Sequence, residues 1–223
     1  FLIPTYLLFT FGLFNLAGIK PFLLQNQLIF IVIATTAFFV VKKLGTLVFR
    51  ANTYLLYGVF ILLLVLTLFI GEEINGSRRW INLYFFNFQT SEFFKIIYIL
   101  ILADFLARQH RRLKEVSVFV IILFSFIIPA VLIFLQPDLE MALFLAVLFV
   151  AITMSSAVPK QYLFTLIGSV LLLMPLSWFF LAEYQKNRIL SFIDPALDPQ
   201  GTAYNMTQSI ITIGSGQLTG RGL

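Results

Sequence analysis

Residues 88–103 have the sequence Phe-Gln-Thr-Ser-Glu-Phe-Phe-Lys-Ile-Ile-Tyr-Ile-Leu-Ile-Leu-Ala, which is apolar enough to lie within a lipid bilayer. Two ionisable side chains, Glu92 and Lys95, interrupt this run three residues apart. On a helix this spacing puts both groups on one face, where they can pair with each other. Because an ionisable group at membrane depth is expensive unless it is paired or faces a wet cavity, these two residues predict a functional site inside a membrane protein.

The composition of the 223-residue chain agrees with a membrane protein. It is 60% hydrophobic, 17% aromatic and only 11% charged, whereas a soluble domain carries about 25% charged residues. The chain has no cysteine, which excludes disulfides, thiolate catalysis and cysteine-based metal sites. The net charge of +5 does not by itself indicate nucleic-acid binding, because basic residues also set the orientation of membrane helices.

Apolar runs of about 20 residues, the length of a membrane-crossing helix, predict an all-α polytopic membrane protein. We find no internal repeat, so we expect a single membrane domain over residues 1–223. Residues 183–223 are polar and glycine-rich and predict a large extracytoplasmic loop at the C-terminal end. The seven predicted spans are residues 1–18, 27–45, 53–70, 88–106, 116–135, 139–157 and 160–182.

Basic residues lie in alternate connections between these spans, and by the positive-inside rule those connections are cytoplasmic. The polar groups of chemical interest therefore collect at the outer side, in residues 71–87, residues 136–138 and the tail. The pair Asp104 and Arg108, four residues apart, predicts an ion pair at the cytoplasmic end of its helix. The cytoplasmic basic residues are Lys42, Lys43, Arg50, Arg108, Arg111, Arg112, Lys114 and Lys160.

The first outward segment is Asn75-Gly-Ser-Arg-Arg-Trp80, a turn signal followed by two cations and an indole. Adjacent arginines can hold a phosphate or a carboxylate through two hydrogen bonds, and Trp80 suits the interfacial belt. The alternative is that Arg78 and Arg79 pair with the acids at residues 72–73 or with lipid head groups.

The second outward segment is Gln136-Pro-Asp-Leu-Glu140. Asp138 fits ordinary capping of a helix start, but it also fits as a counter-charge for Lys95, which enters the membrane from the same side. A cluster of Glu92, Lys95 and Asp138 could serve as a packing clamp, a cation site or the floor of a substrate cavity.

The third outward segment is the tail. Its two Asp-Pro steps, at Asp194 and Asp198, favour turns. Glycines between residues 214 and 222 let the backbone approach a ligand closely, and together with Arg221 they could hold a pyrophosphate. The alternative is a plain flexible loop.

These segments occur in a fixed order along nearly the whole chain, and in that order they resemble the SEDS family, which includes RodA, FtsW and SpoVE. The Asp-Pro, Gln-Ser and Gly-Ser-Gly run is most similar to the RodA-like branch. Two positions depart from the family pattern: Thr90 stands where Pro is usual, and Glu140 where Gly is usual. The segments that carry the resemblance are Asn75-Gly-Ser-Arg-Arg-Trp-Ile81, Phe88-Gln-Thr-Ser-Glu-Phe-Phe-Lys95, Leu135-Gln-Pro-Asp-Leu139, Tyr184-Gln-x-x-Arg-Ile189, Asp194-Pro-x-x-Asp-Pro-x-Gly201, Gln208-Ser209 and Ile213-Gly-Ser-Gly216.

The resemblance implies a ten-helix fold and a peptidoglycan glycosyltransferase that polymerises lipid II at the outer face of the bacterial cytoplasmic membrane. It also implies a class B penicillin-binding protein as partner and no cofactor other than a possible divalent cation, Mg or Mn. Such a transfer needs a carboxylate base and positive charge on the departing pyrophosphate. The expected substrate and cavity network is Arg78, Arg79, Trp80, Gln89, Glu92, Lys95, Gln136, Asp138, Arg188, Asp194, Asp198, Gln208, Ser209 and Arg221.

The resemblance places the family's catalytic aspartate downstream of the glycine-rich run, beyond Leu223. We therefore expect no catalytic residue in these 223 residues, a native protein that extends beyond both ends, and no activity from the chain alone. Two other functions stay open at this point. Buried charges and helix-interior prolines also fit a transporter or lipid flippase, and a chain that ends here would fit a non-catalytic scaffold.

Overall fold

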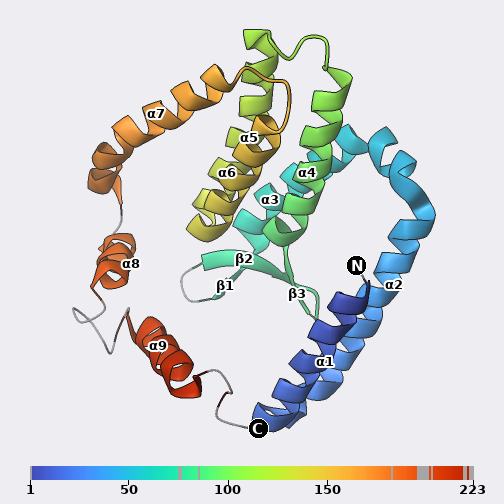
Figure 1. Cartoon of the computed structure of the whole chain (residues 1–223), viewed down its shortest axis with the longest axis vertical. Coiled ribbons are helices and arrows are strands. Elements are labelled where there is room, and N and C mark those ends of the chain that lie inside the picture. The colour runs from blue at the N-terminus through green and yellow to red at the C-terminus, as the bar shows by residue number, and fades with distance from the viewer. Residues whose placement is uncertain are drawn as a thin grey trace. The chain divides into compact units, whose positions relative to one another are not determined.

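The computed structural model describes residues 2–74, 77–84, 86–181, 183–194, 201, 203–217 and 220. Helices predominate, and a short sheet follows the third of them (Figure 1). Contacts divide the chain into two compact units, residues 44–169 and the pair of segments 1–43 and 170–223. The predicted single membrane domain is not tested by this division and stays a prediction.

The unit of residues 44–169 is built on four packed helices: α3 (Thr53–Ile70), α4 (Thr90–Arg108), α5 (Val116–Leu135) and α6 (Leu139–Met154). Helix α3 contacts α4 and α5, and α6 contacts the same two helices (Figure 1). Side chains four residues apart on α4 are buried together because they share one helix face. That stripe is Phe94, Tyr98, Leu102 and Leu106, which belongs to a core cluster with Leu64, Ile122, Ile133, Leu145 and Phe149.

A three-stranded antiparallel sheet connects α3 to α4, in the order β1 (Glu72–Ile74), β2 (Ser77–Asn82) and β3 (Asn87–Gln89). Strand β2 contacts α3 and α4, so the sheet is held against one end of the helices. The sequence predicts a turn here, and the strands on either side of it were not expected. The missed signal is the Asn-Gly dipeptide at residues 75–76, which lies outside the described residues and favours a two-residue hairpin between its flanking segments.

Helix α5 contains Pro129, which cannot donate a backbone hydrogen bond to the carbonyl of Ser125 one turn earlier. The hydroxyl of Tyr57, on α3, donates to that carbonyl at 3.0 Å. A side chain of a neighbouring helix thus satisfies the acceptor that proline leaves open, as backbone groups inside a membrane require.

Replacing Tyr57 with phenylalanine is expected to lower the free energy of unfolding by about 1 kcal/mol, because the Ser125 carbonyl then loses this donor while its surroundings stay apolar. Denaturation in detergent measures the change. Tyr54→Phe is the matched control, since Tyr54 is exposed and its hydroxyl makes no hydrogen bond within the described residues. Equal stability of wild type and Tyr57→Phe would contradict the assignment.

The other unit begins with a helical hairpin formed by α1 (Leu2–Ile19), the short 3₁₀ turn η1 (Pro21–Leu23) and the first part of α2 (Leu24–Ala51). The Tyr6 hydroxyl donates to Thr35 Oγ1 at 3.2 Å across this hairpin. Helix α2 is interrupted at Gly45, whose φ of 72° is accessible to glycine without strain. This break coincides with the predicted end of the second span.

Every predicted span corresponds to a helix, and the seventh is α7 (Lys160–Ser177). By length and composition, the helices able to cross a membrane are Leu2–Ile19, Pro21–Ala51, Thr53–Ile70 and Val116–Leu135, and Leu139–Met154 and Lys160–Leu173 are shorter apolar helices. The predicted class, a mostly helical polytopic membrane protein, is confirmed, with the small sheet as an addition.

The tail differs from a plain loop. After the 3₁₀ turn η2 (Trp178–Phe180) it contains α8 (Glu183–Ile193) and α9 (Tyr204–Gly216). Helix α9 includes Gly214 and Gly216, which were expected either to let the backbone approach a ligand or to lie in a plain flexible loop. Apolar residues at helical spacing, such as Met206, Ile210 and Ile213, favour the helix over a loop.

Candidate functional site

The carboxylate of Asp138 joins three separate elements of the 44–169 unit. Asp138 is the N-cap of α6, and its Oδ1 accepts a hydrogen bond from the backbone nitrogen of Met141 at 3.3 Å. The Arg79 guanidinium on β2 approaches the same oxygen at 3.4 Å, and Gln89 at the end of β3 donates to Oδ2 at 3.3 Å. With its side chain only 2% exposed, Asp138 is a buried anion whose oxygens are occupied by protein donors.

Strand geometry decides which of the two adjacent arginines reaches Asp138. Successive side chains of a strand point to opposite faces. Arg79 turns toward the helices, has a side chain only 19% exposed, and also donates to the carbonyl of Pro137. Arg78 points the other way and pairs with Glu73 at 3.1 Å, both half exposed. The alternative of pairing with residues 72–73 therefore holds for Arg78 and not for Arg79.

Further polar groups surround this cluster inside the same end of the bundle. The hydroxyls of Thr67 and Thr90 lie 2.8 Å apart, and the Gln136 side-chain amide donates to the Leu64 carbonyl at 3.0 Å. Two buried atoms, Gln136 Oε1 and Arg79 Nε, have no hydrogen-bond partner within the described residues. Buried polar atoms without a partner are uncommon, which makes this end of the bundle a candidate site for a polar ligand.

Glu92 and Lys95 pair with each other at 2.6 Å, as predicted from their spacing. Lys95 Nζ also lies 5.0 Å from the centre of the Phe144 ring on α6. The expected contact between Lys95 and Asp138 was wrong, because Asp138 pairs with Arg79 and no ion pair joins it to Lys95. Lys95 lies outside the buried stripe of α4, on a partly exposed face, and Asp138 belongs to the enclosed end of the bundle.

Replacing Lys95 with alanine is expected to lower the free energy of unfolding by only about 1 kcal/mol, since the pair with Glu92 is partly exposed. Unfolding in detergent measures it, with Lys114→Ala, an exposed lysine without an ion pair in the described structure, as control. A loss of about 3 kcal/mol or more would mean that Lys95 compensates a buried charge after all.

The structure brings Arg79, Gln89 and Asp138 together, with Gln136 in the adjoining turn. Trp80 lies in β2 between Glu72 and Gln89 of the neighbouring strands. The remaining predicted residues belong to the tail, in the other unit. Arg188 is in α8, and Asp194 directly follows this helix, with its backbone nitrogen donating to the Leu190 carbonyl at 2.8 Å. Gln208 and Ser209 are in α9. Asp198 and Arg221 lie outside the described residues.

Sequence reasoning missed Thr67, Thr90 and Ser91. All three side chains are buried beside the cluster, and Ser91 receives a hydrogen bond from Gln89 at 3.3 Å. A single Ser or Thr in an apolar run does not predict a buried polar contact between elements, because its hydroxyl can equally bond to the backbone of its own helix. Thr67 also does this, donating to the Leu63 carbonyl at 2.7 Å.

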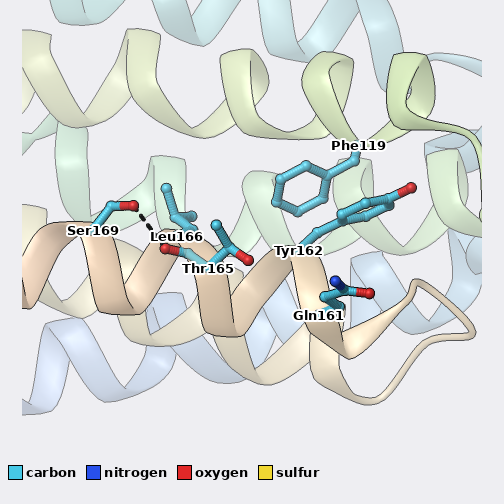
Figure 2. A pocket seen from close by; sticks show the side chains of 6 residues that line it. All are labelled: Phe119, Gln161, Tyr162, Thr165, Leu166 and Ser169. Atoms are coloured by element: carbon cyan, nitrogen blue, oxygen red, sulfur yellow. Dashed lines mark hydrogen bonds between the residues drawn. The ribbon is translucent and has the colours of Figure 1, made fainter.

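A cavity of about 440 Å³ opens between α5 and α7 (Figure 2). The polar residues Gln161, Thr165 and Ser169 follow one another at intervals of four along α7, opposite Phe119 of α5. These are the first turns of both helices, and none of the lining residues belongs to the predicted network. The cavity is therefore separate from the Asp138 cluster.

A family model described as cell cycle protein, FtsW/RodA/SpoVE, matches residues 7–223. The chain is 37% identical over 167 residues to a probable peptidoglycan glycosyltransferase FtsW of Thiomicrospira cyclica, covering 73% of this chain and 42% of that protein. It is 34% identical over 170 residues to the peptidoglycan glycosyltransferase MrdB of Escherichia coli, covering 75% and 45%.

Solved structures agree. One, described as showing structural coordination of polymerization and crosslinking by a peptidoglycan synthase complex, matches with a TM-score of 0.79 and 32% identity, covering 94% of this chain and 63% of that one. The rod shape determining protein RodA of Thermus thermophilus matches with a TM-score of 0.65 and 29% identity, covering 74% and 55%. The chain spans about half the length of the curated relatives it matches.

Proposed function

The chain belongs to the FtsW/RodA/SpoVE family of cell cycle proteins, and from this premise we propose that the whole protein is a peptidoglycan glycosyltransferase. It polymerises lipid II at the outer face of the bacterial cytoplasmic membrane, for cell elongation or division. Relatives named peptidoglycan glycosyltransferase support the activity. The proposal concerns the whole protein, since the chain spans about half the length of those relatives.

The observation that carries the proposal is the enclosed ion pair between Arg79 and Asp138, completed by Gln89. It lies at the end of the bundle that the distribution of basic residues predicts to be outward. A buried charge pair beside two polar atoms that have no partner within the described residues is unusual for mere helix packing, and it suits a site for a polar, anionic substrate.

In the proposed reaction, a sugar hydroxyl of one lipid-linked glycan attacks the anomeric carbon of another. A new carbon–oxygen bond forms, the bond to undecaprenyl pyrophosphate breaks, and the hydroxyl proton passes to a carboxylate base. Asp138 does not suit the role of base, because Arg79, Gln89 and Met141 already donate to its oxygens. We assign it to holding Arg79 and the β2–β3 strands in place.

Arginine side chains of the outer face supply positive charge for the departing pyrophosphate. Arg78 is the accessible candidate, because its side chain is 52% exposed and its partner Glu73 is similarly exposed. A surface pair of this kind exchanges easily for a phosphate. Arg188 and Arg221 remain proposed members of the same network.

Metal dependence is a separate part of the proposal. Within the described residues, no group of three or more His, Cys, Asp or Glu side chains could hold a metal ion. Because Mg²⁺ is often held by one or two carboxylates together with substrate phosphates, a divalent cation that arrives with the substrate stays part of the proposal. Polymerisation measured with and without EDTA tests whether a cation accompanies the substrate.

The proposed partner is a class B penicillin-binding protein. Support comes from the solved structure that relates polymerization to crosslinking in a peptidoglycan synthase complex, where a similar chain is present. Co-purification of the full-length protein with that partner, and stimulation of polymer formation by it, is the corresponding test.

The transporter alternative has weaker support. Between the outer cluster at Thr90 and the inner Asp104, the buried stripe of α4 carries Phe94, Tyr98 and Leu102. These side chains are at most 1% exposed and fill the space between α4 and its neighbours. A polar path through this unit would have to displace them.

The decisive experiment uses purified full-length protein, labelled lipid II and separation of the glycan products by gel electrophoresis. Polymer formed by the wild type, and lost when the downstream aspartate expected from the family is replaced by alanine, supports the proposal. No polymer from a folded protein that instead moves lipid II across proteoliposomes would favour the transporter. If the protein shows neither polymerisation nor lipid II transport, the non-catalytic scaffold would remain as its function.

A further inference from the structure

Asp104 is a second buried carboxylate, at the end of α4 opposite to Thr90 and the Asp138 cluster, which is the predicted cytoplasmic end. Its side chain is 4% exposed. Arg108 Nε donates to its Oδ2 at 2.7 Å, the pair that the spacing predicted. Arg50 Nε, from the end of α2, donates to Oδ1 at 3.1 Å, a contact that no local spacing predicts.

The Asp104 carboxylate holds both guanidinium groups in place, and each group donates to it through Nε. Arg108 Nη2 donates to the backbone carbonyl of Arg50 at 3.0 Å, which ties the two arginines together. The terminal nitrogens of Arg50, and Nη1 of Arg108, make no hydrogen bond within the described residues. The Arg50 and Arg108 side chains are 57% and 48% exposed, so these donors face outward from the bundle.

The charge of this cluster is not balanced. Two guanidinium groups surround the Asp104 carboxylate, which is itself shielded from water. The cluster therefore carries a net charge of about +1. The Tyr54 ring, 5.8 Å from Arg108 Cζ, supports that guanidinium from the side. Tyr54 is itself 57% exposed, so its ring adds apolar surface beside the Arg108 guanidinium.

We propose that Arg50 and Arg108 bind the phosphate of an anionic phospholipid in the cytoplasmic leaflet. Guanidinium forks match phosphate oxygens, and here buried Asp104 holds two of them in advance, which reduces the ordering entropy that binding must overcome. The cluster lies at the cytoplasmic boundary by the positive-inside rule, where lipid phosphates are concentrated. The exposed Tyr54 ring beside Arg108 suits an acyl chain of the same molecule.

The test measures lipid binding by the full-length protein in a zwitterionic detergent, by native mass spectrometry, with phosphatidylglycerol or phosphatidylcholine added. We expect preferential retention of phosphatidylglycerol, weakened about fivefold in Arg50→Gln. Arg111→Gln is the matched control, since Arg111 is an exposed cytoplasmic arginine that loses the same charge and has no ion pair within the described residues. Its affinity should stay within about twofold of wild type.

Arg50→Lys tests the site if Arg50→Gln does not fold. Lysine can still pair with Asp104, but it cannot bind a phosphate through the two parallel N–H groups of a guanidinium. This variant should also bind phosphatidylglycerol more weakly than Arg111→Gln does. Equal weakening in the Arg50 and Arg111 variants would overturn the site in favour of general charge attraction. Protection from thermal unfolding by inorganic phosphate equal to that by phosphatidylglycerol would overturn the lipid as its source. None of these readouts depends on polymerisation.

Discussion

Replacing Arg79 with alanine is expected to lower the free energy of unfolding by about 3 to 5 kcal/mol, because Asp138 would keep its charge in a buried position without a cation. Gln89 and the Met141 backbone nitrogen would remain as donors but carry no charge. Denaturation of the purified protein in detergent measures the loss. Polymerisation by the full-length protein should fall on the order of 100-fold, since β2 and β3 would no longer be fixed against α6.

The adjacent arginine provides the control. Arg78→Ala removes the same charge from the same strand, but its pair with Glu73 is exposed, so the stability should change by about 0 to 1 kcal/mol. If Arg78 contacts the pyrophosphate, this variant loses polymerisation without losing stability. Similar destabilisation by the two substitutions would show that the Arg79–Asp138 pair does not stabilise the bundle.

Replacing Phe94 with alanine is expected to lower the free energy of unfolding by about 3 kcal/mol. Phe94 is fully buried at the contact of α3 and α4, where its ring lies 5.9 Å from that of Tyr98 and 6.1 Å from that of Tyr57. In a bilayer the unfolded reference is also apolar, so the loss comes from the cavity and the missing packing contacts. Thermal unfolding in detergent or nanodiscs measures it.

Phe93→Ala is the matched control on the same helix. Phe93 is 47% exposed, and within the described residues its ring stacks on Phe88 at 4.6 Å between ring centres, so its loss should cost less than about 1 kcal/mol. Because Phe94 lies one turn below Thr90, its removal should also loosen the Thr67–Thr90 contact and reduce activity. Equal effects of the two substitutions would contradict the direction in which α4 is buried.

The helices were predictable because each apolar run of residues is long enough to cross a bilayer, where only internal hydrogen bonds satisfy the backbone. The Glu92–Lys95 and Asp104–Arg108 pairs were predictable because helical spacing brings their side chains to one face. The sheet was missed because its strands are short and polar, and the helical spans dominate the hydrophobic pattern.

Sequence alone determined the class of protein, and it predicted the positions of its spans and the outward collection of its polar segments, because these depend on composition and on distances along a single helix. Tertiary structure decided the partners of its buried charges. The choice of Arg79 over Lys95 for Asp138, and the addition of Arg50 to Asp104, join residues 59 and 54 positions apart. Such pairs depend on which strand face and which helix ends meet, and no local spacing specifies that.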